Sequence, residues 1–164
     1  MKMPKYFLSC DWGTSSFRLA LVNFSSLKVE EEIANDDGIK PLNEKNSFKS
    51  SLERFNTFCT YLDSQIETLS PLDEDIPIMI SGMASSTLGL RELAYAKLPI
   101  PMDASQLCYG HFSLPSRRTA FLISGIQSGD GIARGEEVQA LGLSNYLTGE
   151  RPARLILPGT HSKH

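Results

Sequence analysis

The sequence predicts an α/β domain built on a mixed sheet, and three observations support this prediction. Three short strand-like runs open the chain, one long amphipathic segment follows them, and later apolar runs end in small residues. The chain has 164 residues, of which 41% are hydrophobic and 21% are charged, values typical of a globular domain. A chain of this length buries roughly two thirds of its unfolded surface, so one compact domain is expected without a structural metal.

The opening strands are separated by turn-forming residues. Tyr6–Cys10 and Phe17–Phe24 are apolar runs that flank the polar segment 11–16, which predicts two strands joined by a tight turn. A third run, Leu27–Ala34, alternates apolar and charged residues, as does a strand with one buried and one exposed face. We expect these three strands to form an antiparallel meander.

A long helix is predicted over Phe48–Leu69, because apolar residues recur there at three- and four-residue steps. Asn46 or Ser47 is a candidate N-cap, and Pro71 is a stop signal. We expect this helix to pack across one face of the sheet.

Two further strands, Ile76–Ile80 and Thr119–Ser124, run into small residues at their carboxyl ends. Open α/β sheets bind ligands at such ends. A second helix is predicted over Glu136–Tyr146, with two acidic residues in the turn that the helix dipole favours. Leu155–Leu157 then begins another strand.

Charge and cysteine usage limit the function classes. Sixteen basic and 19 acidic residues give a net charge of −3, which weighs against nucleic-acid or anionic-membrane binding. Cys10, Cys59 and Cys108 show no C-x-x-C spacing, so we expect no disulfide among them and a reduced compartment. The first apolar run is too short for a signal sequence or a membrane span, which favours the cytoplasm. The histidines lack ligand spacing.

The segment 11–16 is the first candidate site. Its glycine and hydroxyl side chains suit a phosphate, and Asp11 is suited to Mg²⁺, which takes one or two carboxylates. The alternative is an ordinary Asp-x-Gly hairpin turn without a ligand. The candidate residues of this segment are Asp11, Gly13, Thr14, Ser15 and Ser16.

Two later motifs raise the same choice between function and structure. The strand 155–157 runs into Gly159, Thr160 and Lys163, and two strand-to-Gly-Thr turns could clamp one polyphosphate; the alternative is a plain glycine turn. Glu136 and Glu137 open a helix, where one carboxylate could accept a hydroxyl proton. The alternative is an acidic first turn that only stabilises the helix.

Together, in this order, these motifs resemble the 2-keto-3-deoxy-galactonokinase family. The resemblance rests on Asp-x-Gly-Thr with a downstream arginine, Gly-Glu-Glu-x-Gln-x-x-Gly, and a strand followed by Pro-Gly-Thr-His-Ser-Lys. Residues 81–86 (SGMASS), Gly89 and the segment 98–101 (LPIP) also match, so the resemblance covers nearly the whole chain.

The resemblance implies a ribonuclease-H-like domain of the actin and hexokinase superfamily, in which two such domains close on ATP. Residues 1–150 would form the first domain and residues 151–164 the truncated start of the second, with the adenine site beyond His164. Because the chain stops in a loop-like stretch, we expect a fragment of a longer protein or a shortened sequence.

The resemblance also implies roles for individual residues. The segments 11–16 and 159–160 would take the two phosphate positions, with Lys163 as a further phosphate contact. Glu136 aligns with the catalytic base of related carbohydrate kinases, and Glu137 is the second choice. The candidate substrate contacts are Arg18, Ser85, Ser86 and Arg134. Of these, Ser85 and Ser86 are expected at a helix start, where they could instead be N-caps.

The implied activity is ATP- and Mg²⁺-dependent phosphorylation of a primary hydroxyl of 2-dehydro-3-deoxygalactonate. A homodimer is compatible with this activity. Two other classes stay open: a sugar or nucleotide sensor on the same fold, which would not need Glu136, and an assembly module of the actin type.

Overall fold

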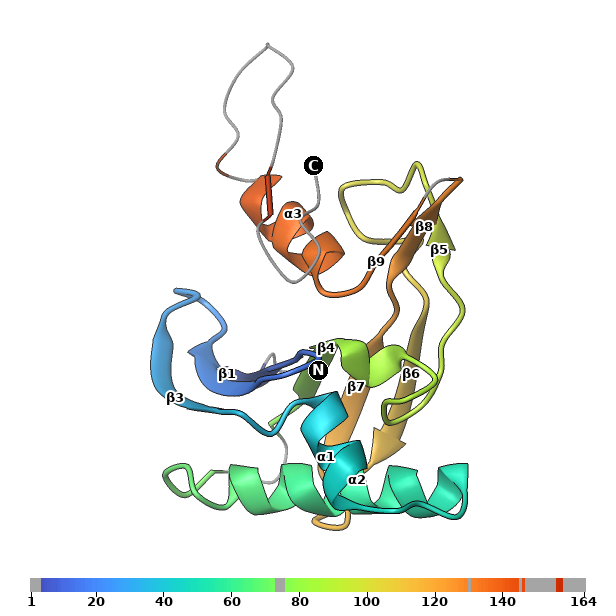
Figure 1. Cartoon of the computed structure of the whole chain (residues 1–164). Helices are drawn as coiled ribbons and strands as arrows, with labels where there is room; N and C mark the ends of the chain where they lie inside the picture. Colours follow the sequence, from blue (N-terminus) through green and yellow to red (C-terminus); the bar gives the residue numbers. More distant parts are fainter. Residues whose placement is uncertain (1–3, 73–75, 130, 145, 147–155, 158–164) are drawn as a thin grey trace.

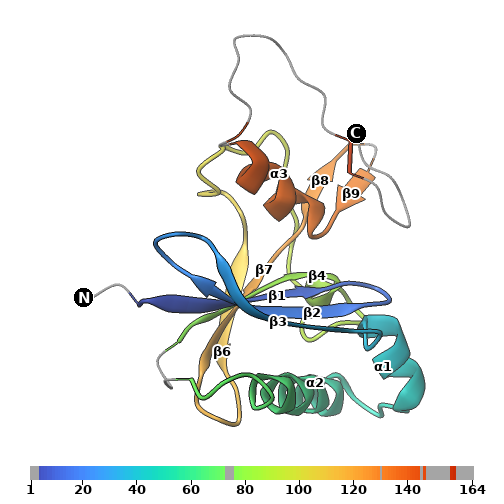
Figure 2. The same ribbon diagram turned by 90° about the vertical axis from the view of Figure 1, so that its left-hand side faces the viewer.

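The computed structural model describes residues 4–72, 76–129, 131–144, 146 and 156–157. Within these residues the chain forms a six-stranded mixed sheet, a three-stranded sheet and three α-helices. Helices α1 and α2 lie on one side of the large sheet, and α3 lies on the other side with the small sheet (Figures 1 and 2). The predicted α/β class with a mixed sheet is therefore confirmed.

The large sheet has the strand order β3-β2-β1-β4-β7-β6. β1 pairs with β2 and β2 with β3 in antiparallel fashion, which confirms the opening meander. β1, β4 and β7 are parallel neighbours, and β6 closes the sheet antiparallel to β7. The strands are β1 (Tyr6–Trp12), β2 (Phe17–Asn23), β3 (Val29–Asn35), β4 (Ile78–Gly82), β6 (Tyr109–Ser113) and β7 (Thr119–Ile123).

Side-chain alternation along β1 separates the core from the opposite face. Leu8, Cys10 and Trp12 are fully buried, whereas Ser9 and Asp11 between them are only half-buried. Because successive residues of a strand point to opposite faces, Trp12 joins the core and Asp11 faces the other side. The Trp12 and Phe58 rings meet edge to face, with centroids 5.2 Å apart.

The long helix packs against the core face, as predicted, but it is shorter at both ends. α2 spans Ser51–Ile66 and begins at Ser50, whose hydroxyl accepts a hydrogen bond from the Glu53 N–H. The candidate N-caps Asn46 and Ser47 were therefore wrong. A separate helix, α1 (Ile39–Lys45), which the sequence did not indicate, precedes α2.

The third strand differs from its prediction in burial. β3 begins at Val29, whose side chain is 54% exposed, and no residue of the strand is completely buried. β3 is the edge of the sheet, so its inward side chains are covered from one side only. Ile33 alone among its apolar residues packs against the core.

The small sheet contains β5 (Ala96–Lys97), β8 (Ile126–Ser128) and β9 (Gly131–Ala133). β5 runs parallel to β8, and β9 runs antiparallel to it. α3 (Glu136–Ser144) follows β9 directly and ends before the predicted Tyr146. Of the predicted strand 155–157, Leu157 forms a bridge, while Leu155 lies outside the described residues. None of the described helices is both long and apolar enough to cross a bilayer.

Candidate functional site

Three segments that are far apart in the sequence meet at the carboxyl ends of β1 and β4. They are the β1–β2 hairpin, the end of β4 at Gly82 with the short 3₁₀ turn that follows it, and the start of α3. This is the edge at which open α/β sheets bind ligands. A close backbone contact between Gly82 and Gly135 joins the end of β4 to the start of α3.

Gly82 and Gly135 allow the backbone of α3 to approach the sheet. Both have positive φ values, +87° and +96°. A Cβ built on Gly135 would lie 3.3 Å from the Gly82 Cα, and one on Gly82 would lie 2.8 Å from the Trp12 carbonyl oxygen. Any side chain at Gly82 would therefore collide with β1. The contact places Glu136, the next residue, beside the end of β1.

The hairpin presents an exposed polar loop. The Gly13 N–H donates to the Ser16 carbonyl at 2.9 Å, which closes the turn between Trp12 and Phe17. Thr14, Ser15 and Ser16 are exposed. A Cβ on Gly13 would meet only ordinary contacts with Ser16, the nearest at 3.4 Å, so the turn does not exclude a small side chain at this position.

Asp11 stands just before this loop, and its side chain is 43% exposed. Burial raises the pKa of Asp11, the nearby Arg18 guanidinium lowers it, and the negative charge of Glu136 raises it further. The Arg18 Nη1 lies 3.7 Å from Asp11, and its Nε lies 3.3 Å from Glu32. Arg18 is thus already paired with two carboxylates.

Glu136 occupies the first turn of α3 and is half-buried. Its carboxylate accepts a hydrogen bond of 2.8 Å from the Arg134 backbone N–H, which turns the side chain back over the helix start. Gly82 connects the two segments, because a Cβ on it would lie 3.3 Å from the Asp11 Oδ1 and a Cβ on Gly135 would lie 3.3 Å from its Cα. The negative charge of Glu136 accordingly acts on Asp11, although 125 residues separate them in the sequence.

Glu137 is the buried member of the acidic pair. It is 2% exposed, and neither of its carboxylate oxygens has a hydrogen-bond partner among the described residues. Burial is the main cause that raises its pKa from 4.5 to about 7. The nearby backbone N–H groups of Gly135 and Glu137, which do not reach hydrogen-bond geometry, oppose this change. A carboxyl with such a pKa exchanges protons near neutral pH.

Both carboxylates line a pocket of about 300 Å³ between the small sheet and α3. Among the described residues that line it, these two are the charged ones and most of the others are apolar. Its apolar lining residues are Leu98, Ile126, Ile132, Ala133, Ala140 and Leu157.

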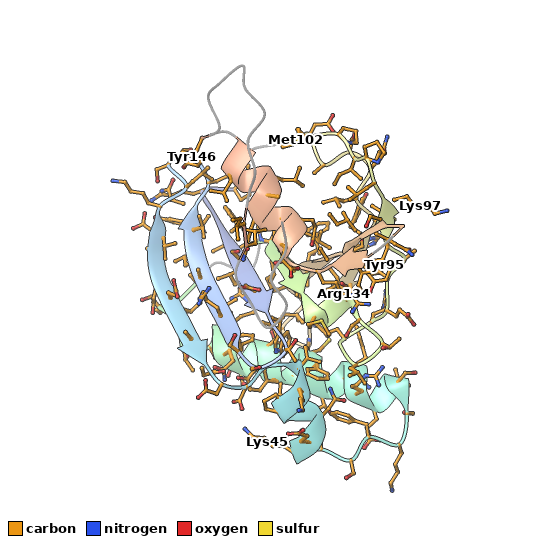
Figure 3. All side chains as sticks on the ribbon, turned by 45° about the horizontal axis from the view of Figure 1, so that its top comes forward. Lys45, Tyr95, Lys97, Met102, Arg134 and Tyr146 are labelled. Carbon is orange, nitrogen blue, oxygen red and sulfur yellow. The ribbon has the colours of Figure 1, made fainter. Side chains whose placement is uncertain are left out.

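Arg134 is fixed by an aromatic ring. Its guanidinium lies 4.6 Å from the centre of the Tyr95 ring, and its Nη1 lies 3.8 Å from the Met83 Sδ. Figure 3 shows the Arg134 and Tyr95 side chains next to each other below α3. Burial lowers the pKa of Arg134, and the negative charges of Glu92 and Glu137 oppose that change. The Tyr95 hydroxyl is buried without a partner among the described residues.

Ser85 and Ser86 are both 1% exposed and lie beneath the site. They end the 3₁₀ turn Met83–Ser85 rather than begin a helix, so the N-cap alternative was wrong. The Ser85 hydroxyl donates to the Gly82 carbonyl at 3.3 Å. The Ser86 hydroxyl has no partner among the residues that the structure describes.

The structure therefore brings together Asp11, the hairpin, Arg134 and the acidic pair. The second phosphate motif, Gly159, Thr160 and Lys163, lies outside the described residues. Sequence reasoning missed Gly38, which packs on the hairpin, and Tyr95, which holds Arg134. The Asp37-Gly38 turn was a signal for the first; no sequence pattern marked the second.

The donor set fits Mg²⁺ and a polyphosphate. No group of three or more metal-ligating side chains occurs in the described part of the chain, but Mg²⁺ needs only one or two carboxylates beside water and phosphate oxygens. Asp11 supplies one, next to a loop with three exposed hydroxyl side chains.

Comparisons with known proteins agree on one family. The model of the 2-keto-3-deoxy-galactonokinase family matches residues 11–164. A relative in Rhizobium meliloti (strain 1021), "Probable 2-dehydro-3-deoxygalactonokinase DgoK1", is 30% identical over 169 residues, which cover 99% of this chain and 50% of the relative. The "Crystal structure of a putative 2-dehydro-3-deoxygalactonokinase protein from Sinorhizobium meliloti" is of a protein that is 29% identical, with a TM-score of 0.75. The match covers 96% of this chain and 48% of that one.

Proposed function

Because the chain belongs to the 2-keto-3-deoxy-galactonokinase family, we propose that the whole protein phosphorylates 2-dehydro-3-deoxygalactonate. The γ-phosphoryl group of ATP would pass to a primary hydroxyl and give the 6-phosphate. The chain spans about half the length of the relatives it matches, so it would supply one half of this enzyme. The observation that carries the proposal is the meeting of Asp11 and its polar hairpin with the acidic start of α3.

The proposed domain arrangement follows from the same family. Residues 1–150 would be a ribonuclease-H-like domain of the actin and hexokinase superfamily, and residues 151–164 would begin a second domain that carries the adenine site. The antiparallel meander followed by the parallel strands β4 and β7 supports this assignment. ATP would then lie between the two domains.

Phosphoryl transfer depends mainly on positioning and on neutralising charge. MgATP, when bound, supplies the phosphoryl group and the divalent cation. Asp11 would hold the hydrated cation, and the backbone N–H groups and hydroxyls of residues 13–16 would bind phosphate oxygens. Gly159, Thr160 and Lys163 are proposed for the opposite side of the phosphates.

We propose Glu136 as the general base. It lines the pocket and is half-buried, and its charge acts on Asp11 across the Gly82–Gly135 contact. Its carboxylate would therefore lie between the substrate hydroxyl and the phosphates. Glu137 remains the second candidate, because its pKa of about 7 suits proton exchange. Glu137 is almost completely buried, whereas Glu136 is only half-buried, and this difference favours a supporting role for Glu137.

Arg134 is proposed to bind the substrate carboxylate through its planar guanidinium. The stacking on Tyr95 fixes its orientation before the substrate arrives. Ser86, whose buried hydroxyl is unpaired among the described residues, is proposed as a hydroxyl contact, with Ser85 beside it. Arg18 is proposed as a weaker contact, because Asp11 and Glu32 already pair with it.

A cytoplasmic location is proposed for the whole protein. The three cysteines are free thiols, two of them buried and one exposed, as expected in a reducing compartment.

A homodimer is a further proposal, which sedimentation of the full-length protein would test.

The decisive experiment uses a full-length version, in which this chain is followed by the second half that its relatives carry. ADP release is measured with several sugar acids. Glu136→Gln should lower kcat by roughly 10²–10⁴-fold, the typical contribution of a general base, whereas Glu137→Gln should lower it less. The reverse order would make Glu137 the base. No activity on any keto-deoxy sugar acid would refute the substrate. An unchanged output after Glu136→Gln would favour a sensor.

A further inference from the structure

The N-terminal turn of α1 binds the back of the β1–β2 hairpin. Three consecutive N–H groups of residues 38–40 donate hydrogen bonds to the three consecutive carbonyls of residues 13–15 (Figure 2 shows α1 beside the hairpin). The bonds run from Gly38 to Ser15 at 3.3 Å, from Ile39 to Gly13 at 3.0 Å and from Lys40 to Thr14 at 2.9 Å. These are N–H groups that a helix leaves unpaired at its start.

All four carbonyls of the hairpin loop are thereby occupied. The Ser16 carbonyl accepts the Gly13 N–H at 2.9 Å, and the other three accept from residues 38–40. The N–H groups of residues 14–16 have no hydrogen-bond partner in the described part of the chain, and these residues are exposed. With its carbonyls bound and its N–H groups free, the backbone of this loop presents donors to a ligand, and the exposed hydroxyls can donate as well, which favours an anion.

Gly38 makes this arrangement possible. It is buried, and a Cβ built on it would lie 2.4 Å from the Ser15 carbonyl carbon, 2.5 Å from the Ser16 nitrogen and 2.5 Å from the Thr14 oxygen. All three atoms belong to the backbone, so no side-chain rotation relieves the collision. A residue with a side chain at this position must push the loop away from α1.

The turn before Gly38 is tied to α2 and to the core. The Asp37 carbonyl accepts the Trp12 indole N–H at 3.0 Å, and the Tyr61 hydroxyl donates to the Asp37 carboxylate at 3.1 Å. The Asn35 side chain donates to the Tyr61 hydroxyl at 3.0 Å, and Lys45 pairs with Asp37. These contacts fix the position of the first turn of α1 relative to the sheet and to α2.

We propose that Gly38 and the first turn of α1 are the positioning element of the phosphate hairpin: they bind its carbonyls and so direct the N–H groups of residues 14–16 outward. This inference rests on the proposed kinase function, because it assigns the hairpin to the phosphates of ATP. None of the site residues that we named from the sequence belongs to α1, so the positioning role is additional to theirs.

Gly38→Ala in the full-length version tests the proposal by kinetics. A displacement near 1 Å costs on the order of a hundredfold in a positioned site, so the KM for ATP should rise by about that factor while the KM for the sugar acid stays unchanged. The matched control is Gly110→Ala, where a Cβ would meet only an ordinary contact at 3.4 Å; both constants should stay the same. An equal rise in both constants for Gly38→Ala, or no rise in either, would overturn the proposal.

Amide hydrogen exchange gives a readout that does not depend on activity. In this chain the N–H groups of residues 38–40 should be protected, and Gly38→Ala should remove their protection while α2 stays protected. Protection that persists would refute the positioning role. If the full-length enzyme shows no kinase activity but the exchange result is as expected, the proposed binding of ATP by the hairpin is refuted. The positioning of the hairpin by α1 is then still supported.

A second variant keeps the test valid if Gly38→Ala does not fold. Tyr61→Phe retains the ring, which packs against Trp12 and Phe17, and removes only the hydroxyl that anchors the turn. A rise of several-fold in the KM for ATP alone, with faster exchange at residues 38–40, supports the proposal. Unchanged exchange at these residues contradicts it.

Discussion

The buried carboxyl of Glu137 should make the stability of the fold depend on pH, and Glu137→Gln should remove that dependence. Burial raises the pKa from 4.5 to about 7 in the folded chain, and unfolding restores the ordinary value. Between these two pKa values the folded state keeps a proton that the unfolded state releases. The free energy of unfolding therefore falls as the pH rises through this window, and the loss is complete above it.

The size of this effect follows from the two pKa values. Their difference corresponds to about 3 kcal/mol of unfolding free energy, and about 2 kcal/mol of it falls between pH 5 and pH 7. Gln has nearly the same shape and no charge at any of these pH values. The free energy of unfolding of the Gln variant should therefore not show this decrease with pH, whatever the absolute stability of the variant.

Urea denaturation at pH 5, 6, 7 and 8 measures the difference. Trp12 is the single tryptophan and is fully buried, so its fluorescence reports unfolding of the core. Glu67→Gln, which changes an exposed carboxylate at the end of α2, is the control and should follow the wild type. Parallel curves for the wild type and Glu137→Gln would refute the reasoning from burial.

Three further predictions concern the backbone, the thiols and the nucleotide. Gly82→Ala should destabilise the fold by at least about 1–3 kcal/mol, because it forces a positive φ on a side chain that meets the Trp12 carbonyl at 2.8 Å; thermal unfolding measures this, and an unchanged Tm would contradict it. Cys108 should react with a thiol reagent in the native chain, and the two buried cysteines only after denaturation without reductant; fewer than three thiols would reveal a disulfide. The 164-residue chain alone should bind MgATP very weakly and show no sugar-acid kinase turnover, because it would offer half of the clamp and tend to self-associate; calorimetry and a coupled assay test this, and tight binding would show that the nucleotide site is misplaced.

The sheet and its main helix could be predicted because their signals are local. The alternation in β1 and β2 and the three- and four-residue spacing in α2 are visible in short windows. The small sheet has strands of two and three residues, which are too short to show a period. α1 has only seven residues and contains Pro41, so neither a repeated apolar spacing nor a high helix propensity marks it. Pro41 is tolerated in the first helical turn, where its N–H would have no partner within the helix.

The candidate site was predictable in its carboxylates and not in its supports. Strand ends and an acidic helix start are sequence features, so Asp11 and the acidic pair were accessible to sequence reasoning. The roles of Gly38 and Tyr95 depend on contacts with residues far away in the chain. The different burial of Glu136 and Glu137 also depends on packing, because neighbouring positions in one helix turn face different surroundings.

The order of the segments along the chain has a consequence for synthesis. All six strands of the large sheet come from residues 6–123, whereas the acidic pair follows at residues 136–137. Since domains fold as the N-terminal part of the chain is made, the sheet is ready to form before α3 leaves the ribosome. We therefore expect α3 to dock on a surface that already exists, so that changes in its carboxylates should alter the rate of unfolding more than the rate of folding.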